Sequence, residues 1–108
     1  VDVIALYDCF SITALMMIED LGFCAKGEGG AFVSGGRLGF DRPRASGGLP
    51  CNTHGGLMSH AYVLGIAHVV EIVRQLRGEA ANQVSDARVG LYGGFTAEEA
   101  ATLILRRA

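Results

Sequence analysis

Paired glycines constrain what this chain can fold into more than any other feature of its sequence. The chain has 16 glycines in 108 residues, and five adjacent pairs account for most of them. The pairs are Gly29-Gly30, Gly35-Gly36, Gly47-Gly48, Gly55-Gly56 and Gly93-Gly94. Large apolar side chains such as Phe32, Leu38 and Leu49 stand between the pairs, which a flexible linker would not hold. Glycine pairs among apolar residues indicate tight turns and close approach of the main chain to other main chain or to a ligand.

Apolar runs and helix-stop signals predict an alternation of strands and helices. One helix is expected over residues 12–21, capped by Ser11 and stopped by Gly22, and a second over residues 57–77, ended by Gly78. Apart from two short strands named next, residues 23–56 are expected to be rich in loops. Strands are predicted at residues 1–6, 31–33, 50–53, 87–91 and 101–105. This alternation indicates an α/β layered domain, and the length allows a single domain over residues 1–108.

Charge and hydropathy exclude several classes of function. The net charge of −2 predicts no nucleic-acid partner and no attraction to an anionic lipid surface. No segment approaches the roughly 18 consecutive apolar residues of a membrane span. Because the chain begins without a charged segment and a small-residue cleavage site, we expect no signal peptide.

The three cysteines form no CxxC pair and are odd in number, which favours reduced thiols and a cytoplasmic location. A zinc site is conceivable from the cysteines and histidines, but none of their spacings is typical of zinc ligands, so we expect no metal. These side chains are Cys9, Cys24, Cys51, His54, His60 and His68.

Tyr62 permits two interpretations. It lies in the segment SHAYVLG, residues 59–65, near the start of the longest predicted helix. Helical spacing places it on one face with four apolar residues, which predicts a core position. Those residues are Ile66, Val69, Val73 and Leu76. Alternatively, the free N–H groups of the first helical turns and the preceding Gly55-Gly56 favour a site that stabilises negative charge. The helical pattern by itself leaves both interpretations open.

Four segments keep the order of motifs found in one known family. They are DCFS at residues 8–11, GEGGAF at 27–32, NTHGGLMSHAYVLG at 52–65 and EIVRQLRGEA at 71–80. Together they resemble the C-terminal half of the thiolase superfamily, in particular sterol-carrier-type thiolases and thiolase-like lipid-transfer proteins. The resemblance implies a βαβαββ domain, a mixed sheet with helices packed on it, that is incomplete without an N-terminal half carrying the nucleophilic cysteine. It also implies a homodimer. We therefore expect residues 1–108 to be a fragment, a split subunit or a truncated protein, inactive alone.

The positions that depart from the family pattern are the polar ones. Tyr62 stands where thiolases have the histidine of Gly-His-Pro, and Tyr7 where sterol-carrier-type thiolases have the histidine of His-Asp-Cys-Phe. The family's Cys-x-Gly motif is matched by GLYGGF at residues 90–95, which has no cysteine. A phenol, with a pKa near 10, activates a thiol poorly but can exchange protons in a retro-aldol reaction. The resemblance to steroid side-chain aldolases implies that Tyr7 and Tyr62 are a catalytic acid/base pair.

Three further residues are candidate substrate contacts. His54 is expected either to contact substrate or Tyr62, or to be satisfied by backbone. Gly93 and Gly94 match the family position where backbone approaches the thioester. Four other residues are expected outside the chemistry, His60 and His68 at a surface or interface and Cys9 and Cys51 as inert buried thiols.

Three functions follow as hypotheses. The first is a lyase domain that cleaves a β-hydroxyacyl-CoA in steroid or lipid side-chain degradation, working with an N-terminal half and a small OB-fold partner protein. The second is an acyl-CoA acyltransferase of the sterol-carrier type. The third is a non-catalytic thiolase-like assembly subunit. None of the three requires a cofactor beyond the coenzyme A that carries the substrate.

Overall fold

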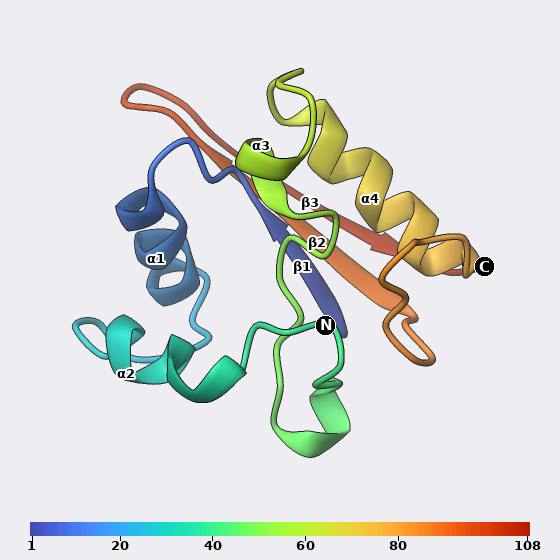
Figure 1. Cartoon of the computed structure of the whole chain (residues 1–108). Helices are drawn as coiled ribbons and strands as arrows, with labels where there is room; N and C mark the ends of the chain where they lie inside the picture. Colours follow the sequence, from blue (N-terminus) through green and yellow to red (C-terminus); the bar gives the residue numbers. More distant parts are fainter.

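A three-stranded mixed sheet forms the centre of the computed structural model, which describes all of residues 1–108 (Figure 1). Its strands are β1 (Val3–Leu6), β2 (Val89–Phe95) and β3 (Ala100–Arg106), in the order β1-β2-β3. β1 is parallel to β2, and β2 is antiparallel to β3. An isolated parallel bridge joins Ile4 of β1 to Cys51 on the other side. The expected strand at residues 50–53 is therefore reduced to this one bridge.

Helices cover both faces of the sheet. Figure 1 shows α1 and α2 on one side of the strands, and α3 and α4 on the other. The helices are α1 (Ser11–Asp20), α2 (Gly29–Val33), α3 (Gly56–Ser59) and α4 (Ile66–Arg77), with 3₁₀ turns η1 (Ser34–Gly36) and η2 (Arg44–Ser46). None of them combines the length and apolar character that a membrane crossing requires.

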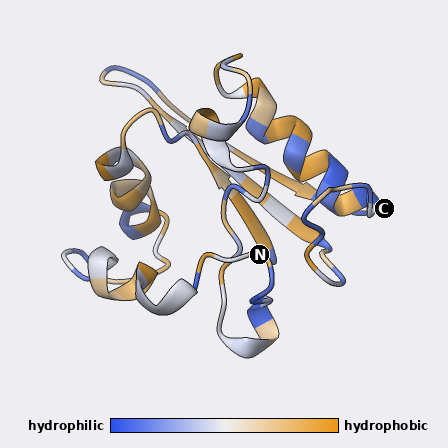
Figure 2. Ribbon diagram, viewed as in Figure 1, coloured by the Kyte–Doolittle hydropathy of each residue, from blue (hydrophilic) through white to orange (hydrophobic).

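The alternation of side chains along β1 divides the core in two. Val3 and Ala5 pack with Ile72 and Leu76 of α4. Ile4 and Leu6 point the other way, into a cluster that includes residues of α1. All four residues of β1 are fully buried, and Figure 2 shows this strand as hydrophobic along its length. Burying an aliphatic side chain of this size contributes about 1.5–3 kcal/mol, so β1 anchors both layers.

The predicted α/β architecture is confirmed, but the segment from 31 to 33 is not a strand. It belongs to α2, whose first N–H group, that of Gly29, donates a 2.9 Å hydrogen bond to the Glu19 carboxylate. Backbone N–H groups of Gly27 and Gly29 lower the pKa of Glu19. A Cβ atom on Gly29 would lie 2.7 Å from that carboxylate, so a larger residue where α2 meets α1 would displace the Glu19 side chain.

The long helix predicted over residues 57–77 is wrong in one respect that matters for function. α3 ends at Ser59, α4 begins at Ile66, and residues 60–65 form a loop. Leu64 has a positive φ of 57°, which a right-handed helix does not allow. At its other end α4 stops as predicted, because Gly78 takes the left-handed conformation and its N–H group caps the last turn.

Two further predictions are wrong: the cap of the first helix and the apolar stripe through Tyr62. Ser11 is the first residue of α1 rather than its cap, and the extended Phe10 precedes it. The predicted apolar stripe is also wrong, because only Leu76 among its members is buried. The face of α4 that packs on the sheet carries polar side chains, which find hydrogen-bond partners in neighbouring loops. Its buried residues are Ala67, His68, Glu71, Ile72, Gln75 and Leu76.

Candidate functional site

Two tyrosine hydroxyls meet at one end of the sheet. The Tyr7 and Tyr62 hydroxyl oxygens are 3.1 Å apart, within hydrogen-bond distance, and either can be the donor. Tyr7 directly follows β1, and its N–H group donates a 2.8 Å hydrogen bond to the Gly93 carbonyl of β2. Tyr62 comes from the loop between α3 and α4 and is 66% exposed. The break in the predicted helix thus carries Tyr62 to Tyr7, across 55 residues of sequence.

The hydrogen bond between the two phenols changes the proton affinity of Tyr7. Together with burial and the neighbouring ionisable groups, it raises the pKa of Tyr7 to about 12. A phenol with this pKa is protonated throughout the neutral range. A phenol hydroxyl can donate one hydrogen bond and accept another, so the two adjacent oxygens can pass a proton between them.

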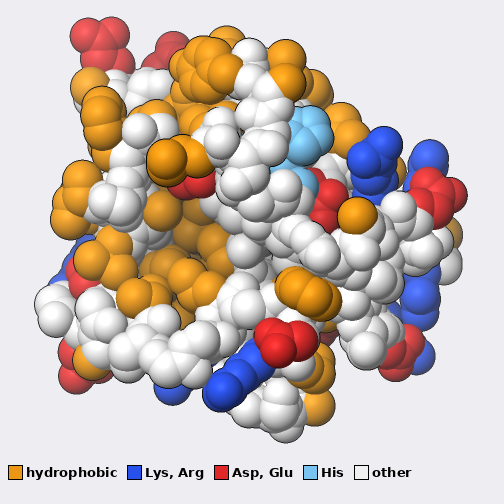
Figure 3. Space-filling view, viewed as in Figure 1, with side chains coloured by type: hydrophobic (Ala, Val, Ile, Leu, Met, Phe, Trp, Pro, Cys, Tyr) orange, Lys and Arg blue, Asp and Glu red, His pale blue; other side chains and the backbone are white.

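A pocket of about 450 Å³ opens beside the pair. Its walls are Tyr7, the loop residues Leu64 and Gly65, and the β2 residues Tyr92 and Gly94, closed by the turn between β2 and β3. Figure 3 shows hydrophobic side chains gathered over this end of the molecule, near the hairpin and the loop before α4. The lining contains no lysine, arginine or histidine. Such a surface suits the acyl part of a ligand better than a phosphate.

Glycines on two sides make room for Tyr92. A Cβ atom on Gly65 would lie 2.0 Å from the Tyr92 hydroxyl oxygen, and one on Gly94 would lie 2.5 Å from it. Burial raises the pKa of Tyr92. We did not expect this residue to line the site. The sequence did contain a signal for it. Tyr92 stands two residues before Gly94 in GLYGGF, and residues two apart in a strand lie on the same face.

A hydrogen-bonded histidine–aspartate pair lies behind the tyrosines. His68 of α4 is fully buried, and its Nε2 is 2.9 Å from the Asp8 carboxylate. The same carboxylate accepts the N–H group of Leu57 at 3.2 Å. His68 was expected at a surface or interface, which is wrong, because α4 turns this side chain towards the sheet. Its ring centroid lies 6.0 Å from that of Tyr7 and 6.2 Å from that of Tyr92.

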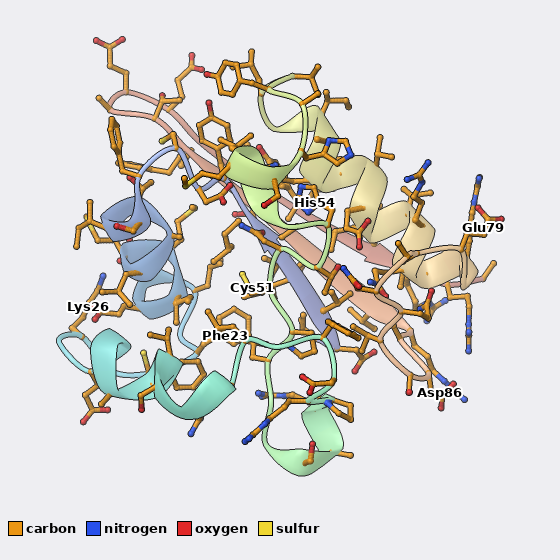
Figure 4. All side chains as sticks on the ribbon, in the orientation of Figure 1. Phe23, Lys26, Cys51, His54, Glu79 and Asp86 are labelled. Atoms are coloured by element: carbon orange, nitrogen blue, oxygen red, sulfur yellow. The ribbon has the colours of Figure 1, made fainter.

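His54 lies between two other histidine rings, at 4.8 Å from His68 and 5.4 Å from His60, measured between centroids. Figure 4 shows it beside α4. Neither ring nitrogen has a hydrogen-bond partner in the chain, so the expectation that backbone satisfies it is wrong. Burial lowers its pKa, and the neighbouring His68 lowers it further. His60 is exposed, as expected, and no group of three metal-ligating side chains is arranged to hold an ion.

The two glycines proposed as substrate contacts lie on opposite faces of β2. Gly94 is in the pocket wall with Tyr7. Gly93 is buried on the side of α1, where an added Cβ atom would lie 2.9 Å from Leu6. The structure therefore brings Tyr7 together with Tyr62, through their hydroxyls, and with Gly94, in the pocket wall. Tyr62, Gly93 and His54 are not part of the pocket lining.

Cys51 and Cys9 differ in how far they are buried. Burial raises the pKa of Cys51 to about 12, which makes its thiol a poor nucleophile. Cys9 is exposed, contrary to the expectation that it is buried. Neither cysteine lines the pocket.

Comparison with known proteins gives one family. The model described as "Thiolase C-terminal domain-like" matches residues 1–107. The chain is 41% identical to the "Steroid side-chain-cleaving aldolase" of Thermomonospora curvata over 93% of this chain and 24% of that protein. It is 42% identical to the "Acetyl-CoA acetyltransferase" of Methanothermobacter thermautotrophicus over 84% of this chain and 24% of that protein.

A solved structure described as "Ltp2-ChsH2(DUF35) aldolase" superposes with a TM-score of 0.80 at 38% identity. The match covers 97% of this chain and 26% of that one. The chain thus spans about a quarter of the length of the curated relatives that it matches.

Proposed function

Because the chain belongs to the thiolase C-terminal domain-like family, we propose that it is the C-terminal domain of an enzyme that cleaves a β-hydroxyacyl-CoA by a retro-aldol reaction. Tyr7 and Tyr62 are the proposed acid/base pair. The observation that carries this proposal is the hydrogen bond between their hydroxyls, which joins Tyr62 to Tyr7 in the wall of an apolar pocket. The names of the two relatives cannot decide between lyase and acyltransferase, since both proteins are about equally similar to this chain.

Retro-aldol cleavage needs one proton removed and one supplied. The O–H bond of the β-hydroxyl breaks, the Cα–Cβ bond breaks, and a new carbonyl forms at Cβ. The electron pair of the broken bond passes to Cα and the thioester, where it takes up a proton. The products are a ketone or aldehyde and a shortened acyl-CoA.

A pair of hydrogen-bonded phenols balances this reaction without a net change of charge. The oxygen of one phenol accepts the β-hydroxyl proton while its own proton moves along the 3.1 Å hydrogen bond to the other. The second phenol gives its proton to Cα. Both tyrosines are neutral before and after the step, in keeping with the raised pKa of Tyr7. A single phenol would have to pass through a phenolate, which is costly at neutral pH.

The first turn of α4 supports the same assignment. Gly65 is both part of the pocket wall and the residue that precedes α4. The N-terminal end of a helix carries partial positive charge and favours a developing anion nearby. Charge that accumulates on the thioester during cleavage would therefore be stabilised at this edge of the pocket, where Gly94 also approaches.

The remaining parts of the proposal concern the complete protein. We propose that residues 1–108 form one domain that shares its site with an N-terminal thiolase half. The enzyme is proposed to be a cytoplasmic homodimer that acts with a small OB-fold partner on steroid or lipid side chains and uses no cofactor besides substrate coenzyme A. Gly93 and His54 are proposed to support the substrate site from outside its lining.

Removing the two hydroxyls tests the proposal. In the complete enzyme, we expect Tyr7→Phe and Tyr62→Phe each to lower kcat for a β-hydroxyacyl-CoA by about 10²–10⁴-fold, the usual contribution of general acid–base catalysis. The double variant should lose little more, because the pair works as one unit. Release of the ketone and of the shortened acyl-CoA is measured by chromatography.

Ser46→Ala is the matched control. It also removes one hydroxyl and one hydrogen bond, to the Pro43 carbonyl, but in a turn away from the pocket. Its kcat should equal that of the wild type. Full activity of the Tyr7→Phe/Tyr62→Phe enzyme would exclude both tyrosines from the chemistry.

The acyltransferase remains the competing function, favoured by the 42% identity to the acetyltransferase. It requires a cysteine from the N-terminal half that forms an acyl-enzyme. Mass spectrometry of the complete enzyme after incubation with acetyl-CoA distinguishes the two. A covalent acetyl adduct that transfers to a second thioester would support the acyltransferase and reject the lyase.

A further inference from the structure

Beyond the proton-transferring pair, we propose that the hydroxyl of Tyr92 donates a hydrogen bond to the carbonyl oxygen of the substrate thioester. This inference rests on the proposed function only in taking an acyl-CoA thioester as the ligand. It gives the third tyrosine of the chain a role that neither Tyr7 nor Tyr62 fills, because those two hydroxyls are engaged with each other.

Tyr92 is held in place on all sides that face the protein. It lies in β2, paired with Ala5 of β1 and Leu103 of β3. Its ring packs near the fully buried His68, at 6.2 Å between centroids. The Tyr92 hydroxyl occupies space that Cβ atoms on Gly65 and Gly94 would otherwise fill. A side chain on a central strand with these neighbours presents its hydroxyl in one fixed position, which a pre-organised donor requires.

The Tyr92 hydroxyl has no partner within the chain, although it lines the same pocket as Tyr7. The hydroxyl belongs to a residue of the pocket wall, so it can donate to an acceptor of the ligand in place of water. The burial that raises the pKa of Tyr92 keeps it neutral, and hence able to donate. The pocket wall therefore presents a fixed hydrogen-bond donor, the Tyr92 hydroxyl, to which a ligand can supply the acceptor.

The charges around the pocket select the kind of acceptor. The lining has no cationic side chain, and Glu99 of the hairpin turn is its one charged residue. A phosphate or carboxylate would be repelled there and would find no counter-charge. A neutral carbonyl oxygen fits, and it becomes a better acceptor as negative charge develops on it during cleavage. The thioester carbonyl is the one oxygen of the proposed substrate that gains this charge.

A pair of ligands that differ only in that oxygen tests the inference. Butanoyl-CoA has the thioester carbonyl, and S-butyl-CoA has a CH₂ group in its place. Neither carries a β-hydroxyl, so neither can be cleaved. Affinities for the complete enzyme are measured by calorimetry. We expect the wild type to bind butanoyl-CoA about tenfold more tightly, as one hydrogen bond of about 1.4 kcal/mol would give.

Two substitutions should remove this preference. Tyr92→Phe is expected to weaken butanoyl-CoA binding about tenfold and to leave S-butyl-CoA binding unchanged. Gly65→Ala should act in the same direction, because its Cβ atom would displace the hydroxyl from 2.0 Å away. Ser46→Ala should retain the full preference. Circular dichroism of each variant checks that the fold is kept.

The inference is overturned if Tyr92→Phe leaves the tenfold preference intact, or weakens both ligands equally, since either result means that the hydroxyl does not contact the carbonyl. A failure of the Tyr92 inference can be told apart from a failure of the proposed function. A Tyr7→Phe/Tyr62→Phe enzyme that no longer cleaves should still prefer the thioester. A wild-type enzyme that prefers the thioester through Tyr92 yet cleaves no β-hydroxyacyl-CoA would reject the lyase alone.

Discussion

All three tyrosines of this chain lie at one end of the sheet, and each uses its hydroxyl differently. Tyr7 and Tyr62 bond to each other, whereas Tyr92 is left without a partner. A phenol both donates and accepts hydrogen bonds, so a pair can move a proton in a way that one tyrosine cannot. Replacing any of the three by phenylalanine preserves the ring and isolates the contribution of the oxygen.

At this scale the structure predicts a pH dependence. The Tyr62 hydrogen bond, with smaller contributions from burial and neighbouring groups, raises the pKa of Tyr7 to about 12, above the usual value of about 10 for tyrosine. Because the folded pKa is the higher one, this contribution to stability is fully present below about pH 10 and is lost as pH rises towards about 12. Tyr62→Phe should lower the pKa of Tyr7 and shift this loss to lower pH.

Ultraviolet titration of tyrosinate in the complete protein measures the change. Tyr92→Phe is the comparison, because it removes another phenol and leaves the pair in place. Because burial also raises the pKa of Tyr92, the test is made in the Tyr92→Phe background, where a late-titrating tyrosine should persist and should be lost when Tyr62→Phe is added. An unchanged titration curve for Tyr62→Phe, after subtraction of one tyrosine, would contradict the coupling of the two hydroxyls.

Among the elements, α4 organises the site through its polar buried face. The Gln75 side chain donates hydrogen bonds to Thr53 Oγ1 at 2.9 Å and to the Asn82 carbonyl at 2.8 Å. It accepts one from the buried Val84 N–H group at 2.9 Å. Glu71 joins the network through Thr53. α4 thus fixes the loop before α3 and the loop before β2.

Breaking this network should destabilise the protein. Gln75→Leu keeps a similar volume but leaves the Asn82 carbonyl and the Val84 N–H group without partners. Unsatisfied buried polar groups cost about 1–3 kcal/mol each, so we expect the free energy of unfolding to fall by about 2–6 kcal/mol. Denaturant titration followed by circular dichroism measures it.

The control lies one residue away on the same helix. Arg74 is exposed, and Arg74→Ala should change the free energy of unfolding by no more than about 0.5 kcal/mol. Equal effects of the two substitutions would mean that the buried network contributes nothing beyond the packing of α4.

At the scale of the whole molecule, a large apolar surface is left uncovered. Met58 is 98% exposed, Phe10 70% and Ile104 63%. β3 has no strand beyond it in the sheet and is exposed over most of its length. Apolar patches of this kind mark interfaces, in keeping with a domain that packs against a further part of the same enzyme.

We therefore predict that residues 1–108 alone do not turn over a β-hydroxyacyl-CoA. Under the proposed function part of the site comes from outside these residues, so activity should appear only when an N-terminal thiolase half is present, joined or added as a separate polypeptide. The assay is the release of shortened acyl-CoA with each half alone and with both. Turnover by the 108 residues without a companion would refute the shared site.

The sequence by itself determined the local features of this protein. Apolar, β-branched runs predicted the strands at both ends of the chain, and Gly78 marked the end of α4, because these signals depend on neighbours in the sequence. The order of the motifs indicated the thiolase family, which the match over residues 1–107 confirms. The pair Tyr7 and Tyr62 was predicted from family positions, and the structure places their hydroxyls in contact.

The tertiary structure decided what depends on segments distant in sequence. The loop at residues 60–65 interrupts a continuous helical pattern, because Leu64 takes a positive φ and Tyr62 reaches across to Tyr7. His68 is buried because Asp8, 60 residues away, supplies its partner. Tyr92 enters the pocket because two glycines on different elements leave space for its hydroxyl. Hydrogen bonds and contacts between remote residues carry no periodic signal, so only the folded chain reveals them.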